Sequence, residues 1–343
     1  MKALVCSDLS TILNRREGEE FKFFPKEIIK KIESKFDVIW NDTGRQFTKE
    51  ELIERVKDVD AVFTCWESNK FDKEILEHAP NLKIIAHLAG SLAPFVSEEV
   101  YDRGIKTIGA NDMHFAESVA EAAILYSLIC LRQIPLIQKN IRNDKDGAWY
   151  KVDAVRGLLG KTVGIVSYGA IADHFARMLQ PFHCKIKVYS RSISDEKLNQ
   201  YKMERASLEE IFSTCDVISV HTAWNKYTEN MVSKELLKMI KPNAVLVNTA
   251  RGKVIDEPAL IEELKTGRFK AALDVFWTEP LERSSELFDL ENAFLMPHCG
   301  GPTPDLYPLI TSDLIDEVYD YLTKGEPLKS EIKREKALSM TLH

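Results

Sequence analysis

The sequence lacks the features that mark several protein classes. Its six cysteines (Cys6, Cys65, Cys130, Cys184, Cys215 and Cys299) contain no CxxC pair and no metal-ligand spacing, so neither a disulfide framework nor a metal site is indicated. It has no excess of positive charge, since Lys+Arg 46 against Asp+Glu 53 gives a net charge of −7. A nucleic-acid partner is therefore not expected, because a protein that binds the phosphate backbone needs a basic face.

Long apolar runs are also absent. The best run covers residues 122–131 and is too short to cross a bilayer. Near the amino terminus an acid, Asp8, comes before any apolar stretch of the kind found in export signals. We expect neither membrane insertion nor export, and the mildly acidic composition suits a cytoplasmic enzyme.

The length and composition predict a globular protein with two domains. The chain has 343 residues, of which 45% are hydrophobic and 29% charged. At about 150 residues per domain this length gives two domains, and such a chain buries roughly three quarters of its unfolded surface.

The first third alternates short β-type runs with helical patterns. This rhythm predicts a parallel sheet covered by helices. The expected strands are residues 3–5, 38–40, 61–64 and 83–86, and the expected helices include residues 25–35 and 49–56.

A long helix is predicted over residues 118–132. It opens with a capping-box pattern from Ser118 to Glu121 and is apolar on most faces, so we expect deep burial at a hinge or an interface. A polar stretch, residues 142–156, interrupts the pattern after it. The polar tail from about Lys329 is expected to be mobile.

The second half contains nearly continuous apolar strands, as expected for strands buried on both faces of a parallel sheet. Helical patterns separate them, including residues 208–212 after a capping box that starts at Ser207, and residues 257–266 ending at Gly267. This half is predicted to be a doubly wound, nucleotide-binding domain. The expected strands are residues 162–166, 186–189, 217–220, 244–247 and 271–275.

Residues 163–172 form a strand that turns into a helix where a dinucleotide fingerprint would lie. A helix N-terminus there offers free N–H groups to a pyrophosphate. Of the fingerprint glycines only Gly169 is present, with Ser167 and Ala172 in the flanking positions, so an ordinary strand-turn-helix remains an alternative. The predicted cofactor contacts of this turn are Ser167, Tyr168, Gly169, Ala170 and Ile171.

The choice of cofactor depends on the end of the second strand. An acid that binds the ribose hydroxyls of NAD is missing there, and the chain has Ser190, Arg191 and Ser192 instead. A guanidinium can bind a 2′-phosphate, so NADP is favoured over NAD. The alternatives are that Arg191 is a solvated surface residue and that the cofactor is NAD.

Three strings near the ends of later strands carry an Arg, a Glu and a His. They are residues 248–252 with Arg251, residues 272–280 with Glu279, and residues 296–301 with His298. In this order they resemble the D-isomer-specific 2-hydroxyacid dehydrogenases, and the resemblance runs from about residue 61 to about residue 327.

The resemblance implies a role for each of the three. Arg251 binds the substrate carboxylate and keto oxygen, His298 is the general acid/base, and Glu279 holds and polarises His298. Their chemistry agrees, because a guanidinium can oppose charge on the keto oxygen and an imidazole can supply its proton. We expect His298 to be charged when a keto acid is reduced. Taken singly, each residue could instead be structural.

The resemblance extends the sites further. Asp274 would meet the nicotinamide carboxamide, and His221, Thr222 and Ala223 would line the adenosine side. The backbone of Ala89, Gly90 and Ser91 would receive the substrate carboxylate, although Leu92 and Pro94 depart from the family's usual Gly and Asp. The remaining expected cofactor contacts are Thr228, Thr249, Ala250, Arg251, His298, Gly300 and Gly301.

Trp66 lies where relatives that oxidise phosphoglycerate have a basic residue. An indole cannot neutralise a phosphate, which argues for a substrate with an apolar or small side group. The alternative is that Trp66 belongs to the core of the first domain.

By the same resemblance the fold is α/β, with two doubly wound parallel-sheet domains. Residues 1–112 and 303–343 would form a smaller, flavodoxin-like substrate domain, and residues 113–302 a Rossmann domain. The final helix, residues 306–323, would return to the first domain, leaving a cleft between two lobes that close by a hinge. Pairing through the nucleotide-binding domain would give a homodimer.

The leading hypothesis is an NAD(P)-dependent oxidoreductase that interconverts a 2-keto acid and its D-2-hydroxy acid. A glyoxylate or hydroxypyruvate reductase is the narrower expectation. The alternative is a nucleotide-sensing, corepressor-like interaction protein on the same fold.

Overall fold

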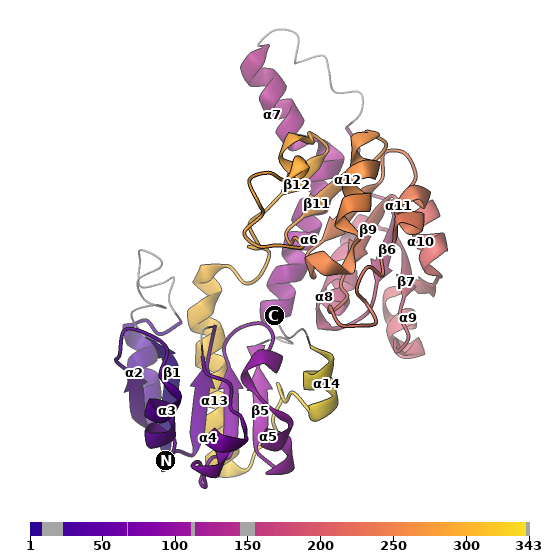
Figure 1. Ribbon diagram of the computed structural model, residues 1–343. Helices are drawn as coiled ribbons and strands as arrows, with labels where there is room; N and C mark the ends of the chain where they lie inside the picture. The colour runs from indigo at the N-terminus through magenta and orange to yellow at the C-terminus, as the bar shows by residue number, and fades with distance from the viewer. Residues whose placement is uncertain (9–22, 67, 111–113, 145–154, 341–343) are drawn as a thin grey trace. The chain divides into compact units, whose positions relative to one another are not determined.

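The structure is a computed structural model that describes residues 1–343 except 9–22, 67, 111–113, 145–154 and 341–343 (Figure 1). Two compact units divide the chain: Met1–Ala116 with Pro302–His343, and Glu117–Gly301. The expected boundary between residues 112 and 113 and most of the polar stretch 142–156 lie outside the described residues.

The first unit contains a parallel sheet of five strands in the order β2-β1-β3-β4-β5 among the described residues. This is the order of flavodoxin-like folds. The strands are β1 (Lys2–Asp8), β2 (Asp37–Asn41), β3 (Ala61–Thr64), β4 (Ile84–His87) and β5 (Lys106–Gly109). The helices are α2 (Lys26–Lys35), α3 (Lys49–Arg55), α4 (Lys73–Glu77), α5 (Glu98–Asp102), α13 (Tyr307–Lys324) and α14 (Arg334–Ser339).

Helix α13 brings the end of the chain back to the first unit. Its apolar face, which includes Leu314 and Ile315, is buried in one cluster with Ala3 and Val5 of the central strand β1. Beside it, the Lys31 ammonium of α2 lies 2.6 Å from an Asp316 carboxylate oxygen. The return of this helix thus agrees with the sequence pattern, within one residue at each end.

The prediction of a mobile tail is wrong for residues 329–340. Ile332 is buried, its N–H donates to the carbonyl of Thr107 on the edge strand β5 at 2.8 Å, and the Thr107 hydroxyl donates back to the Ile332 carbonyl at 2.6 Å. An added Cβ on Gly109 would lie 2.7 Å from the Ile332 side chain, so the absence of that carbon makes room for it. One isoleucine beside an open sheet edge fixes a segment whose composition is otherwise polar.

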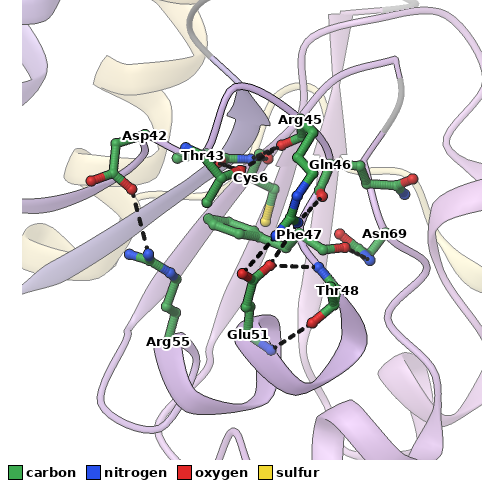
Figure 2. A network of polar contacts seen from close by, with 11 residues as sticks. Cys6, Asp42, Thr43, Arg45, Gln46, Phe47, Thr48, Glu51, Arg55 and Asn69 are labelled. Carbon is green, nitrogen blue, oxygen red and sulfur yellow. Dashed lines mark hydrogen bonds and ion pairs between the residues drawn. The ribbon is translucent and has the colours of Figure 1, made fainter.

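The loop after β2 is fixed by side-chain hydrogen bonds (Figure 2). Asn41 donates to the carbonyls of Cys6 and Arg45, at 2.8 and 3.0 Å. Arg45 forms two bonds to Glu51, and Thr48 caps α3 in a reciprocal capping box with the same glutamate. These bonds join the carboxyl ends of β1 and β2 to the start of α3.

In the described part of the second unit, seven parallel strands are arranged in the order β12-β11-β10-β9-β6-β7-β8. The strand order reverses between β6 and β9, which is the switch point of a doubly wound fold. The strands are β6 (Thr162–Val166), β7 (Lys185–Tyr189), β8 (Met203–Arg205), β9 (Val217–Val220), β10 (Val245–Asn248), β11 (Lys270–Leu273) and β12 (Ala293–Leu295). The helices are α6 (His114–Arg132), α7 (Ile134–Asn143), α8 (Ala170–Leu179), α9 (Asp195–Tyr201), α10 (Leu208–Thr214), α11 (Lys234–Met239) and α12 (Glu257–Lys265).

Helix α6 differs from its prediction in two ways. It begins at His114, so Ser118 lies inside the helix and is no cap; its hydroxyl donates to the Gly301 carbonyl at 3.3 Å. The helix is also not buried on all faces, since Leu125 is 51% exposed. The following helix α7, which the sequence did not predict, has no buried residue and extends beyond the seven-stranded sheet in Figure 1.

By length and composition α6 could cross a membrane, the one such helix found in the described residues. The apolar run of residues 122–131 is too short for this by itself, but the helix around it has 19 residues. Half of the apolar window is buried within the protein, where Ala123, Tyr126 and Cys130 belong to the core beneath β6. Core helices of this kind satisfy the same criteria as membrane spans.

Candidate active site

The turn from β6 into α8 can hold a pyrophosphate. Gly169 is the N-cap of α8 and provides no side-chain cap, so the N–H groups of the first turn have no acceptor within the helix. An added Cβ on Gly169 would meet no atom within 4 Å, which means that space above the helix end is open. The described residues therefore fit the phosphates of a dinucleotide.

Ser167 occupies the position of the first fingerprint glycine and adopts its backbone conformation. Its φ of 71° lies in the left-handed region that glycine prefers. The Ser167 hydroxyl lies 2.6 Å from that of Thr222, at the end of the neighbouring strand β9. This bond between strand ends holds a non-glycine residue in the turn.

The end of β7 carries Ser190, Arg191 and Ser192, as the sequence indicates. The Ser192 N–H donates to the Ser190 hydroxyl at 3.2 Å, which turns the chain after the strand. Arg191 is exposed and has no ion pair or hydrogen bond to any described residue. Its guanidinium is available to an anionic ligand.

His221, a predicted contact on the adenosine side, has its ring packed inside the unit. Its ring packs against Phe175 of α8 at 5.1 Å, and both ring nitrogens are buried without a partner among the described residues. Burial lowers the pKa of His221 to about 3, so the imidazole is neutral. Only its backbone takes part at this edge of the sheet, through an N–H bond to Val166.

The other residues of this loop hold its shape. The Thr228 hydroxyl donates to the Ala223 carbonyl at 2.6 Å and accepts from the Asn225 N–H at 2.9 Å. Thr222 and Thr228 are both buried. The loop after β9 is thus closed on itself beside the dinucleotide turn.

Glu279 and His298 form a close pair. Nδ1 of His298 lies 2.5 Å from Glu279 Oε2, while Glu279 Oε1 accepts from the Phe276 N–H at 3.0 Å. Burial acts to raise the pKa of Glu279, but the bonds from His298 and Phe276 outweigh it and hold that pKa below its ordinary value. A carboxylate on one ring nitrogen leaves Nε2 to exchange a proton with a ligand.

The Arg251 guanidinium is subject to the charge of the same carboxylate. It follows β10, where the Asn248 side-chain amide donates to the Arg251 carbonyl and fixes the turn. Burial lowers the pKa of the guanidinium and the charge of Glu279 opposes that change. Nη1 donates to Ala250, but Nε and the neighbouring Thr249 hydroxyl are buried with no partner among the described residues. Unpaired buried donors are costly, and an anion would satisfy them.

Asp274 organises the turn that carries His298. It is 1% exposed, and its Oδ1 accepts from the N–H groups of Cys299 and Gly300, both at 3.0 Å. Oδ2 accepts from Gly300 alone among the described residues. The second oxygen therefore retains capacity for a further donor, such as a carboxamide.

An apolar cavity of about 560 Å³ adjoins the pair. His298 and Glu279 form part of its wall, and most of the remaining lining is apolar, including Phe276, Leu281 and Met296. A few polar groups beside an apolar cavity are typical of sites for small organic molecules.

In the first unit, Trp66 is no core residue, because it is 45% exposed. Its ring meets Phe23 and Tyr307 edge-on, at 5.6 and 6.1 Å, and those two rings stack on each other at 4.2 Å. Neither Phe23 nor Tyr307 was predicted to contact Trp66. No local pattern links three aromatic residues so far apart in the chain.

The residues after β4 present backbone rather than charge. Ala89 is buried, Gly90 and Ser91 are partly exposed, and an added Cβ on Gly90 would lie 3.4 Å from the Phe115 ring. A short 3-10 helix, Ala93–Phe95, follows directly. Within the described ranges, no group of three His, Cys, Asp or Glu residues gathers as metal ligands.

Comparisons with known proteins give one consistent family. Residues 22–162 match the model for the catalytic domain of D-isomer specific 2-hydroxyacid dehydrogenases, and residues 124–300 match the model for their NAD binding domain. A glyoxylate reductase of Pyrococcus furiosus is 37% identical, covering 81% of this chain and 84% of its own. A hydroxypyruvate reductase of Thermotoga maritima is 32% identical over 82% and 90%.

Solved structures with a similar fold agree with this family. The solved structure of a D-mandelate dehydrogenase from Rhodotorula graminis covers 97% of this chain and 98% of its own with a TM-score of 0.79. At 24% sequence identity this likeness concerns the fold alone.

Proposed function

Since the chain belongs to the D-isomer specific 2-hydroxyacid dehydrogenase family, we propose that it reduces a small 2-keto acid to the D-2-hydroxy acid with NAD(P)H. The observation that carries the proposal is the 2.5 Å contact between His298 and Glu279, whose charge also acts on the Arg251 guanidinium. Acid/base chemistry on a keto acid needs these three groups together.

Each residue has a defined part in the reaction. The nicotinamide cofactor, when bound, supplies hydride to the keto carbon. Arg251 binds the substrate carboxylate and opposes the negative charge that develops on the keto oxygen. His298 gives its Nε2 proton to that oxygen, and Glu279, kept ionised by its lowered pKa, stabilises the imidazolium before the transfer.

In the Glu117–Gly301 unit, the turn after β6 would bind the pyrophosphate, and Arg251, Glu279 and His298 would act on the keto acid. The backbone of residues 89–91, in the other unit, would bind a carboxylate. Arg191, which has no partner among the described residues, supports a preference for NADPH through its 2′-phosphate.

The substrate would be a keto acid with a small or apolar side group. Trp66 carries no charge that could bind a phosphate. Its indole is exposed and packs edge-on against the ring of Phe23. The named activities of the relatives, glyoxylate and hydroxypyruvate reduction, support a small 2-keto acid.

A homodimer formed through the nucleotide-binding unit is part of the proposal. Helix α7 has no buried residue, and the side chain of Ile134 at its start is 45% exposed. Leu125 of α6 is 51% exposed. Apolar residues on two consecutive helices are typical of a surface that a second copy covers.

The test is a steady-state screen of glyoxylate, hydroxypyruvate, pyruvate and 2-ketoisocaproate, each with NADH and NADPH. We expect wild-type turnover with at least one pair, and a loss of at least about 100-fold in His298→Ala and Arg251→Ala. Wild type as inactive as both variants on every pair would overturn the proposal and favour a nucleotide-sensing, corepressor-like role. A strong preference for NADH would overturn the part that rests on Arg191.

A further inference from the structure

The turn that presents His298 has an unusual backbone. His298 has a φ of 51°, in the left-handed region, and its N–H donates to the carbonyls of Asp274 and Met296 at 2.9 and 3.0 Å. A residue with a side chain is disfavoured in this region, so the surroundings must hold it there. The direction of the imidazole depends on these restraints.

Asp274 provides most of those restraints. Its carbonyl accepts from His298, and its carboxylate accepts from the next two residues, Cys299 and Gly300. The turn packs tightly on the carboxylate, because an added Cβ on Gly300 would lie 2.9 Å from Oδ2. A small rotation of this carboxylate would therefore move the His298 backbone.

One side chain holds the carboxylate itself. The Tyr126 hydroxyl of α6 donates to Asp274 Oδ1 at 3.3 Å and lies 4.0 Å from Cys299 Sγ. Tyr126 is 3% exposed and its ring contacts Phe294 of β12 at 5.8 Å. Burial, together with the charge of Asp274, raises the pKa of Tyr126 far above its usual range, so the hydroxyl keeps its proton and acts as the donor.

We propose that Tyr126 is a positioning residue for the reaction: it orients the Asp274 carboxylate, and that carboxylate fixes the turn that aims His298 at Glu279 and at the substrate. Tyr126 donates its hydrogen bond to Oδ1, so Oδ2 is the oxygen that can accept from a further donor. The inference rests on the proposed function for its effect on turnover, but its effect on the His298–Glu279 contact is independent of any substrate.

The experiment compares Tyr126→Phe with Tyr201→Phe in the full chain. The second variant is a matched control, because the Tyr201 hydroxyl also donates to an aspartate, Asp173 Oδ2, at 3.3 Å and lies in the same unit away from His298. The first readout is the downfield proton resonance of the His298 Nδ1–H in its 2.5 Å contact with Glu279, assigned by its absence in His298→Gln. The second is kcat and KM for the best keto acid of the screen.

We expect Tyr126→Phe to shift or broaden the resonance and to lower kcat by about three- to tenfold with a smaller change in KM, as loss of one hydrogen bond to a charged group implies. Tyr201→Phe should change neither. The double variant Tyr126→Phe/Asp274→Asn should have nearly the same kcat as Asp274→Asn alone, because Tyr126 acts through Asp274.

An unchanged resonance in Tyr126→Phe would overturn the inference whatever the turnover, as would an equal change in Tyr201→Phe. If the wild type turns over no keto acid, the proposed function fails while the resonance still decides the role of Tyr126. If Tyr126→Phe does not fold, the same resonance in Asp274→Asn decides the matter: an unaltered signal there would contradict any role for the carboxylate.

Discussion

The two units present different chemistry at the carboxyl ends of their strands. In the larger unit the turns after the strands carry ionisable groups: Glu279 and His298 lie 2.5 Å apart, and the charge of Glu279 acts on the Arg251 guanidinium. In the smaller unit they carry apolar rings and short side chains, with Trp66 after β3 and Ala89 and Gly90 after β4. Both sheets are parallel and open, so the topology of each unit offers the same kind of edge.

This contrast teaches that similar folds can be assigned separate tasks by the residues at one edge. The bond between Glu279 and His298 fixes two ionisable side chains closely, as stabilisation of a transition state would require. Stacked rings such as Phe23 and Tyr307 give a surface its shape, as selection of a side group would require. The predictions below test this division.

The largest effect is expected for Glu279→Gln. An amide cannot stabilise the imidazolium, so kcat/KM for keto-acid reduction should fall by about 100-fold or more, and the loss of activity with rising pH should begin at lower pH. Steady-state rates between pH 5 and pH 9 measure both effects.

Glu257→Gln is the control for that variant. Glu257 accepts from the Trp277 N–H at 3.0 Å, as Glu279 accepts from Phe276, but it has no bond to His298 among the described residues. A comparable loss in Glu257→Gln would mean that any carboxylate bonded to the loop after β11 matters, and the assigned role of Glu279 would be lost.

The next effect concerns the cofactor. Arg191→Ala should raise KM for NADPH by about tenfold and change KM for NADH much less, because one charge-assisted contact to a 2′-phosphate is removed. Lys185→Ala removes one exposed charge from the opposite end of the same strand and should leave the NADPH/NADH ratio unaltered. Equal behaviour of the two variants would mean that Arg191 does not bind the phosphate.

A smaller effect is expected in the other unit. Trp66→Ala should reduce kcat/KM several-fold more for 2-ketoisocaproate than for glyoxylate, since an apolar pocket contact is worth about 1–3 kcal/mol. Trp40→Ala, at a ring that meets Phe24 edge-on in the same unit, serves as the control. A uniform loss on both substrates would assign Trp66 a structural role instead.

The smallest effect is on stability and is expected in both units alike. Burial lowers the pKa of His87 in β4 and of His221 after β9 to about 3, below the value of about 6.5 in an unfolded chain. The unfolded state therefore binds more protons, so the stabilisation is complete above about pH 6.5 and declines as the pH falls toward 3. Between pH 7 and pH 5.5 each histidine should cost about 1 kcal/mol.

Urea unfolding at those two pH values measures this loss. His221→Phe, which removes two unpaired ring nitrogens, should flatten the pH dependence of the larger unit only. An unaltered slope in that variant would show that His221 becomes protonated without unfolding.

Much of the fold could be predicted from sequence patterns. The strands 61–64, 162–166 and 217–220 agree with the structure to the residue, because buried parallel strands read as continuous apolar runs. Short edge strands were missed: β8 (Met203–Arg205) and β12 (Ala293–Leu295) span three residues each, too few for a periodic signal. The predicted start of helix α6 lies four residues after the observed start at His114, because Ser118 and Glu121 match a capping-box pattern.

The candidate site was predictable where a residue type signals its chemistry and was missed where contacts alone define its part. His298 and Glu279 stand out in short strings, and the structure places them 2.5 Å apart. Tyr126 gives no such signal, since an aromatic residue in an apolar helix is typical of any core. The packing of the His221 ring against Phe175 likewise has no signal in the sequence, and the contact of His221 with adenosine stays a prediction.

The class of fold, the order of the elements and the residue types of the candidate site could be predicted from the sequence, since periodicity and side-chain chemistry are properties of the chain. Tertiary structure alone decided which groups meet and which way they face. A hydrogen bond between residues 148 positions apart, such as Tyr126 to Asp274, exists only after packing has brought two elements together. No local pattern encodes that distance, because the contact depends on every layer between the two residues.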